Sequence, residues 1–245
     1  MTRPEYNWEL PEAIRARLGQ DNYGAQRAIA EAGHVLLVLH EPPKPGAHER
    51  EHAVFLHTPD GQWAFHGQPH GEHALTAVLD RYQKALDGND ALYEKAQHAA
   101  ALFDVIERLR PLARAAANLS VALQKARELT RQDKAVITAR DRAQELSRNA
   151  DLLLADAQLA LNFHLAKQAE AQTRAAEDGQ RAQQKLNLLA AFTFPTMALA
   201  TVFGMNLHSG LEDLHPVGFW LVFAAGGLLG AVLGAWVKAG PTQQR

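Results

Sequence analysis

The 245-residue sequence contains no cysteine. This absence excludes disulfide bonds, thiolate metal sites and a cysteine nucleophile. The sequence also lacks a phosphate-binding glycine loop, a Gly-x-Ser-x-Gly elbow and a His-Glu-x-x-His pair, so we expect a protein that is not an enzyme. The formal net charge is only −2, which gives no reason to expect nucleic acid as a partner.

Charged residues are missing from two stretches near the C-terminus, 186–203 and 217–237. A helix needs roughly 20 predominantly apolar residues to cross the hydrocarbon core of a bilayer. Both stretches are long enough, and we expect two transmembrane helices. The N-terminus lacks the apolar core of a secretory signal peptide, so the region before Leu186 is expected to stay in the cytoplasm.

Basic residues lie on one side only of these two stretches. Arg181 and Lys185 precede the first and Lys238 follows the second, whereas the loop 204–216 has no Lys or Arg. Because cytoplasmic flanks are enriched in Lys and Arg, both termini are predicted to be cytoplasmic. The expected location is the inner (plasma) membrane, with a multi-pass topology.

The first 88 residues predict a small α/β domain. His34 to His40 is an apolar run of strand length, and the runs 52–57 and 62–66 flank a turn at 58–61 as a hairpin would. A helical pattern follows from Gly71, with a break expected at Asp87–Asp90.

Residues 89–185 predict a helical cytoplasmic stalk. A first helix is expected from about Asp90 to Arg131, with a kink at Pro111. From Lys134 strong helix formers dominate and no proline occurs before Pro195. At 1.5 Å per residue this second helix would be roughly 100 Å long and continuous with the first membrane span.

Apolar residues at helical spacing in the second helix indicate a coiled-coil or bundle stripe: Leu146, Leu153, Ala157, Ala160, Leu161 and Leu165. The alternative is that acidic residues of this helix contribute to a cation site between subunits: Asp141, Glu145, Asp151 or Asp156. The predicted fold class is thus an α-helical membrane protein with two C-terminal transmembrane helices, a long helical stalk and a small N-terminal α/β domain. The predicted segments are 1–88, 89–185, 186–203, the external loop 204–216, 217–237 and the cytoplasmic tail 238–245.

The first apolar stretch ends in "TFPTMALATVFGMN", Thr193 to Asn206, and is followed by a short acidic loop and a second apolar stretch. This arrangement resembles the CorA family of divalent-cation channels and transporters, whose signature is Gly-Met-Asn at the outer end of the first of two spans. The resemblance covers 134–237, and the N-terminal domain only in broad layout. It implies a homopentamer in which the first span lines the pore and the second faces lipid.

The resemblance makes Gly204, Met205 and Asn206 the selectivity filter. Mg²⁺ loses its water reluctantly, so a ring of amide and carbonyl oxygens around the hydrated ion suits it better than charged ligands. The same three residues also fit a plain helix C-terminus. Carried back along the helix, the pore-lining pattern selects six residues: Gln183, Leu186, Ala190, Phe194, Met197 and Thr201.

The apolar part of that face, from Leu186 to Met197, would form a constriction that gates by dewetting, although plain helix packing gives the same stripe. Glu212 and Asp213 fall where the family's external loop is acidic, and there they would attract cations. They fit equally a solvated loop. In the second span, small residues would permit close helix packing, with Trp220 and Trp236 near the interfaces: Gly226, Gly227, Gly230 and Gly234.

The histidines of this sequence are not part of the CorA-family pattern. His66, His70 and His73 are close enough in sequence to share a Zn²⁺ ion, although histidine-rich loops are commonly just exposed. His208 and His215 flank the outer loop. The family has a zinc-transporting branch with the same Gly-x-Asn scaffold, so a Zn²⁺ transporter is the nearest alternative.

The predicted function is therefore a homopentameric channel or transporter for divalent metal cations, with Mg²⁺ first and Zn²⁺, Co²⁺ or Ni²⁺ as other substrates. Its expected partners are copies of itself, the lipid bilayer and the metal ion, which is transported or regulatory; no other cofactor is expected. The alternative from another class is a non-transporting, membrane-anchored coiled-coil scaffold, in which Asn206 could be changed without consequence.

Overall fold

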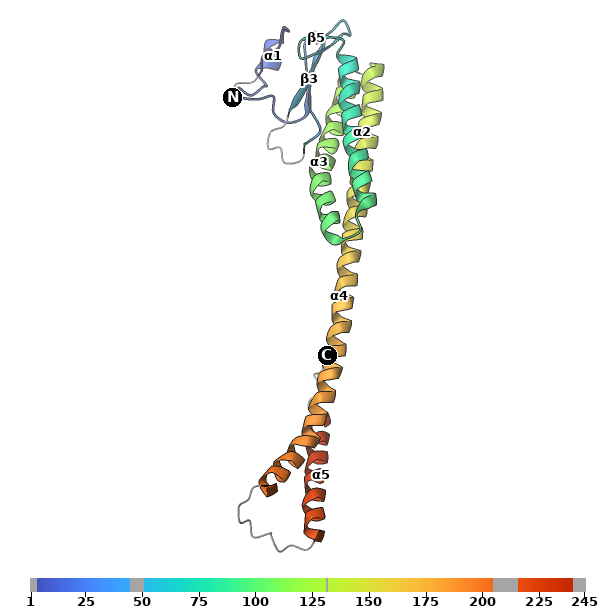
Figure 1. The fold of residues 1–245 in the computed structure, drawn as a ribbon. Coiled ribbons are helices and arrows are strands. Elements are labelled where there is room, and N and C mark those ends of the chain that lie inside the picture. Colours follow the sequence, from blue (N-terminus) through green and yellow to red (C-terminus); the bar gives the residue numbers. More distant parts are fainter. Residues whose placement is uncertain (1–3, 45–50, 131, 205–215, 240–245) are drawn as a thin grey trace. The chain divides into compact units, whose positions relative to one another are not determined.

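A computed structural model of the chain describes residues 4–44, 51–130, 132–204 and 216–239. The chain divides into two compact units, Met1–Ala166 and Lys167–Arg245. The division falls inside the stretch 89–185 that is predicted as a stalk. Figure 1 shows the elements of both units.

The first unit contains one antiparallel sheet in the order β1-β2-β3-β4-β5. The strands are β1 (Arg27–Glu31), β2 (His34–His40), β3 (His52–His57), β4 (Trp63–Phe65) and β5 (Gln68–Pro69). Each strand pairs with the next along the chain. The predicted strand His34–His40 and the hairpin after it are therefore confirmed, and β1 and β5 are additional.

Both faces of the sheet are covered, because successive side chains of a strand point to opposite faces. Leu37 and Leu39 of β2 belong to a core shared with α2 (Gly71–Lys95) and α3 (Ala99–Thr130). Leu36 and Val38 belong to a second core, which includes Ile14 of α1 (Glu12–Arg15) and the segment before it. This double burial explains why β2 is a continuous apolar run instead of an alternating one.

The long helix α4 (Lys134–Gly204) is continuous over 71 residues, as predicted. Its first part belongs to the same core as α2 and α3, through buried residues that alternate three and four positions apart: Val136, Ala139, Ala143, Leu146, Ala150, Leu153 and Ala157. This spacing is the one at which apolar residues stay on one helix face over many turns. Beyond Ala157 the burial ends, and Leu165 is 50% exposed.

The predicted break at Asp87–Asp90 is wrong, because α2 continues through it to Lys95. Two side-chain hydrogen bonds support the helix there: Gln83 Nε2 donates to Asp87 Oδ1, and Asn89 Nδ2 donates to the carbonyl of Ala85. Leu86 is buried on the same turn. Tertiary packing thus overrides the local turn signal, and α3 begins at Ala99 instead of near Asp90.

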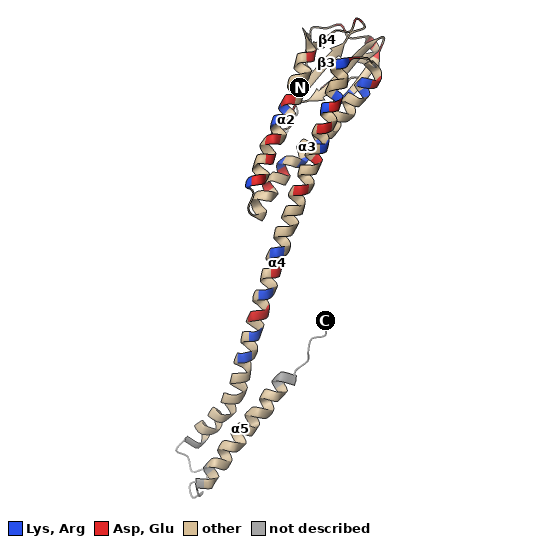
Figure 2. Ribbon diagram, turned by 90° about the vertical axis from the view of Figure 1, so that its right-hand side faces the viewer, with Lys and Arg blue, Asp and Glu red and all other residues tan. Residues whose placement is uncertain are grey.

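The second unit consists of the rest of α4 and of α5 (Pro216–Ala239). Charged residues end on α4 at Lys185, and none occurs in the described part of α5 up to Trp236 (Figure 2). Among the described residues, one helix contains a window long and apolar enough to cross a membrane, within Lys134–Val202; the apolar part of α5, Trp220–Trp236, is shorter. A second full span stays a prediction.

Candidate functional site

The candidate site is the apolar end of α4 together with α5. Gly204 is the last residue of α4. Met205 and Asn206 of the predicted filter lie outside the described residues, as do Glu212 and Asp213 of the predicted acidic ring. The described geometry is therefore that of α4, the helix that leads to the predicted filter, and of its packing partner α5.

Three glycines spaced four residues apart form the surface of α5 that faces α4. A β-carbon added at Gly226 would lie 3.0 Å from Leu199 Cδ1, one at Gly230 would lie 3.2 Å from the Phe192 carbonyl oxygen, and one at Gly234 would lie 3.1 Å from Phe192 Cε2. A β-carbon at Gly227 would meet nothing within 4 Å. Of the four glycines predicted to allow close packing, three therefore lie in the contact and Gly227 does not.

The residues of α4 in this contact lie on one helix face, represented by Leu188, Phe192 and Leu199. Successive residues of an α-helix are about 100° apart, so the six predicted pore-lining residues are centred about 180° away from this face. Leu186, Phe194 and Met197 of that opposite face are 63–67% exposed. By this geometry the predicted pore-lining residues share the side of α4 opposite α5, and Ala190 is the half-buried one among them. Their role in lining a pore stays a prediction.

The polar groups of this face are bonded within the helix. Gln183 Nε2 donates to Asn187 Oδ1 at 3.2 Å, and Thr201 Oγ1 donates to the Met197 carbonyl at 2.8 Å. Such back-bonding satisfies a hydroxyl in apolar surroundings without a partner from another helix. From Leu186 to Met197 the face is consequently apolar, and Ala190 is its half-buried member.

Pro195 lies inside α4 at the level of the α5 contact. Proline has no backbone N–H, so the carbonyl of Ala191, four residues earlier, loses its usual helical donor. Gly230 packs over this position, since a β-carbon there would be 3.5 Å from the Ala191 oxygen. The glycine surface of α5 therefore covers the part of α4 that the proline weakens.

The predicted zinc site at His66, His70 and His73 is not assembled. Within the described ranges no group of three His, Cys, Asp or Glu side chains could hold a metal ion. His66 is engaged elsewhere: the Val54 N–H donates to its Nε2 at 3.1 Å, and its ring stacks on those of Tyr6 and Phe65. Burial lowers the pKa of His66, against the opposing hydrogen bond to the His52 backbone. His70 and His73 are exposed.

Acidic residues of α4 were the other candidate for a cation site. Asp141 pairs with Arg140 at 2.8 Å, and with Glu145 it lines an open hollow of about 410 Å³ that also contains Arg148. Asp151 and Asp156 are exposed. The described part of the chain therefore shows no cluster of carboxylates around one point.

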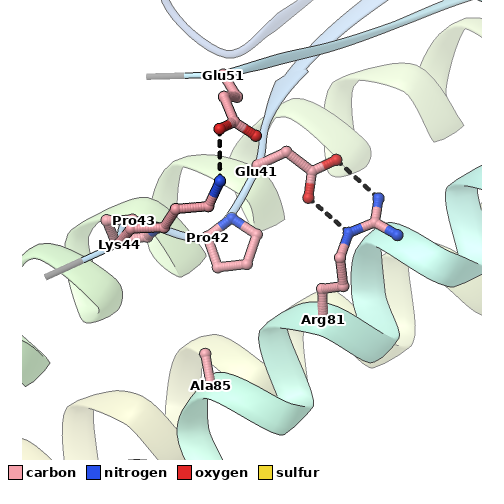
Figure 3. Close-up of a pocket in the computed structure, with 7 residues that line it drawn as sticks. All are labelled: Glu41, Pro42, Pro43, Lys44, Glu51, Arg81 and Ala85. Carbon is pink, nitrogen blue, oxygen red and sulfur yellow. Dashed lines mark hydrogen bonds and ion pairs between the residues drawn. The ribbon is translucent and has the colours of Figure 1, made fainter. Parts of the chain in front are cut away.

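A second hollow, of about 460 Å³, lies beside β2 and α2 (Figure 3). Arg81 clamps Glu41 through two bonds, Nε to Oε2 at 2.6 Å and Nη2 to Oε1 at 2.7 Å. Its hydrogen bond to Glu41 is the main cause that raises the pKa of Arg81. Lys44 pairs with Glu51 on the same rim. The charges of this hollow are thus matched among themselves, and we assign it no ligand.

No protein-family model matches the sequence, and no curated protein matches it. Among solved structures, the chain is similar to the CorA magnesium transporter from Methanocaldococcus jannaschii, with 13% identity over 94% of this chain and 83% of that one and a TM-score of 0.41. It is also similar to the full-length CmaX protein, with 19% identity over 94% of this chain and 81% of that one and a TM-score of 0.43.

Proposed function

We propose that this protein is a membrane channel or transporter for divalent metal cations, with Mg²⁺ as its main substrate, and that it works as a homopentamer. The observation that carries the proposal is the division of α4 into two opposite faces. One face packs against the glycines of α5, and the other presents the predicted pore-lining residues and leads to Gly204.

The exposed apolar surface of α4 and α5 supports a location in the membrane. Leaving a large apolar side chain in water costs roughly 1.5–3 kcal/mol relative to burying it, and a continuous patch of this kind is typical of a lipid or protein contact. The exposed large side chains are Leu186, Leu189, Phe192, Phe194, Met197 and Val202 on α4, and Val217, Trp220, Leu221, Phe223, Leu228, Leu229, Val232, Leu233 and Trp236 on α5. Lipid would cover α5, and other copies of the chain would cover the pore-lining face.

Self-association follows from the number of spans. Two helices per chain cannot enclose an aqueous path, so a pore requires several chains. The stretches 186–203 and 217–237 contain no ionisable residue, which argues against an intramembrane proton relay. We therefore propose that a hydrated cation passes along the apolar face of α4, and that this face gates by dewetting. The number five comes from the family resemblance.

In this proposal Asn206 and the Gly204 carbonyl bind the waters of one ion at the outer mouth of the pore. Glu212 and Asp213 would form an acidic ring that concentrates cations in front of it. Both termini would lie in the cytoplasm, so that the filter faces outward. With an inside-negative potential of 100 mV a divalent cation entering the cell would gain roughly 4.6 kcal/mol.

The test is ion flux into voltage-clamped liposomes, with Mg²⁺, Zn²⁺, Co²⁺ and Ni²⁺ compared side by side for the wild type and Asn206→Ala. Native mass measurement first establishes that both preparations contain equal amounts of pentamer. We expect Mg²⁺ flux to fall in the variant while the pentamer persists. Asn206 comes two positions after Gly204, the last residue of α4, in the sequence, and truncating a polar residue next to a helix terminus costs on the order of 1 kcal/mol.

Three outcomes contradict parts of the proposal. Undiminished flux in Asn206→Ala would show that Gly204-Met205-Asn206 is only a turn, whereas a monomer or dimer as the sole species would remove the channel altogether. Zn²⁺ flux exceeding that of Mg²⁺ would favour the zinc-transporting alternative.

A further inference from the structure

Asp133 fixes the start of α4. Its Oδ1 accepts hydrogen bonds from the backbone N–H groups of Ala135, at 2.8 Å, and Val136, at 3.2 Å. These bonds satisfy donors that have no partner within the first turn of a helix. Asp133 is thus the N-cap of the helix that ends at Gly204.

The other oxygen of the same carboxylate faces the sheet. Trp63 Nε1, at the start of β4, donates to Asp133 Oδ2 at 2.6 Å. His57 Nε2, at the end of β3, lies 3.6 Å from the same oxygen. His57 and Trp63 are paired across the two strands, with ring centroids 4.8 Å apart. One carboxylate therefore joins the first turn of α4 to two neighbouring strands, and we call these three residues the His57–Asp133 junction.

The imidazole of His57 is held where only its neutral form is satisfied. Its side chain is 15% exposed, and its Nδ1 is buried with no hydrogen-bond partner among the described residues. In the neutral ring, Nδ1 can remain without a hydrogen while Nε2–H is directed toward Asp133. A second proton would have to sit on Nδ1, and a buried N–H donor without an acceptor is costly.

We propose that the His57–Asp133 junction is a proton-responsive latch, in which protonation of His57 loosens the attachment of β3 and β4 to the start of α4. The positive charge of the protonated ring also competes with Trp63 for Asp133 Oδ2. At neutral pH the hydrogen bond from Trp63 Nε1 to this oxygen ties α4 to the sheet. The proposal goes beyond ion transport and does not depend on it, because the latch lies in the unit Met1–Ala166 and can be measured without flux.

Three titratable groups, each from a different segment, act on His57. Asp133 at the start of α4 and Asp60 in the turn after β3 favour the protonated ring, and His34 of β2 opposes it. Burial is the largest influence, and it lowers the pKa of His57. The latch is therefore closed above the ordinary histidine pKa, and it opens as the pH falls through that value toward the lower pKa of the folded state.

Hydrogen–deuterium exchange of the full chain in detergent micelles tests this, at about pH 7.5 and about pH 5.5, with rates corrected for the intrinsic effect of pH. The informative peptides are β3–β4 and the first turns of α4. We expect the protection of both to fall several-fold at the lower pH in the wild type, and to stay constant in His57→Gln, whose amide does not titrate. His66→Gln is the matched control: His66 is also a partly buried histidine, in the turn between β4 and β5, and its replacement should leave the response at the start of α4 intact.

A wild type without any fall in protection, or a His57→Gln variant that keeps the fall, would overturn the proposal. If His57→Gln does not fold, Asp133→Asn provides the second test. Asparagine can still cap a helix, but it removes the carboxylate that favours the protonated ring. The midpoint of the fall in protection should then move to lower pH, and an unchanged midpoint would contradict the latch.

Discussion

Gly230 of α5 lies directly against Phe192 of α4, so close that a β-carbon at position 230 would be 3.2 Å from the Phe192 carbonyl oxygen. Contacts of this kind let two helix backbones approach without intervening side chains, which is how helices commonly associate where water supplies no driving force. The contact also determines which face of α4 remains available to other molecules. The packing of α5 and the proposed pore are thus two consequences of one arrangement.

The first prediction concerns this contact. Gly230→Leu should force α4 and α5 apart, at a cost of about 1–3 kcal/mol, typical of overpacking. Gly227→Leu adds the same side chain to the next residue of α5, where a β-carbon meets nothing within 4 Å. Thermal unfolding of the detergent-solubilised proteins should therefore show a lower midpoint for Gly230→Leu only. Equal midpoints for the two variants would mean that the glycine surface does not hold the helices together.

Elements with a local pattern could be predicted from the sequence, and elements defined by tertiary contacts could not. The helix from Lys134 was predictable because strong helix formers continue without a proline for some 60 residues before Pro195. Strand β1 was missed because only Ile29 of its five residues is buried, which leaves little alternation. The continuation of α2 through Gly88 depends on burial of Leu86. The local sequence contains no pattern that predicts this continuation.

In the candidate site, too, features with a local pattern were predictable and features defined by tertiary contacts were not. The family resemblance selected the six proposed pore-lining residues, and their helical spacing placed them on one face, whereas the position of that face opposite α5 required coordinates. The histidine triad failed because closeness in sequence does not determine where side chains point: His66 turns to Tyr6 and Phe65. The role of Asp133 left a readable signal, an N-cap residue just before a long helix, but its contacts with His57 and Trp63, some 70 residues earlier, left none.

The second prediction is a pH dependence of stability that comes from His66. Burial lowers its pKa, so the folded state favours the neutral ring. The contribution of His66 to the free energy of unfolding is fully present above the ordinary histidine pKa. It is lost as the pH falls below that value toward the lower pKa of the folded state. His66→Gln, which can still accept the Val54 hydrogen bond, should reduce the acid-induced fall in the unfolding midpoint measured from neutral pH downward.

His73→Gln is the control for this measurement, because His73 is exposed on α2, outside the sheet. Its midpoint should fall with acid as steeply as that of the wild type. If His66→Gln behaved in the same way as the control, the stacking of His66 between Tyr6 and Phe65 would not set its protonation.

The last prediction tests the two faces of α4 directly. The chain has no cysteine, so single cysteines can be introduced without background. Met197 is 63% exposed on the face opposite α5, whereas its neighbour Thr196 is half-buried against Gly226. If copies of the chain gather with the Met197 face toward a common axis, Met197→Cys should form disulfide-linked dimers under mild oxidation in membranes, because equivalent residues around a narrow axis come within bonding range. Thr196→Cys should remain monomeric on the same gel, since α5 of its own chain covers it. Cross-linking of Thr196→Cys alone would place the subunit contact on the wrong side of α4, and the proposed pore-lining residues would then face lipid.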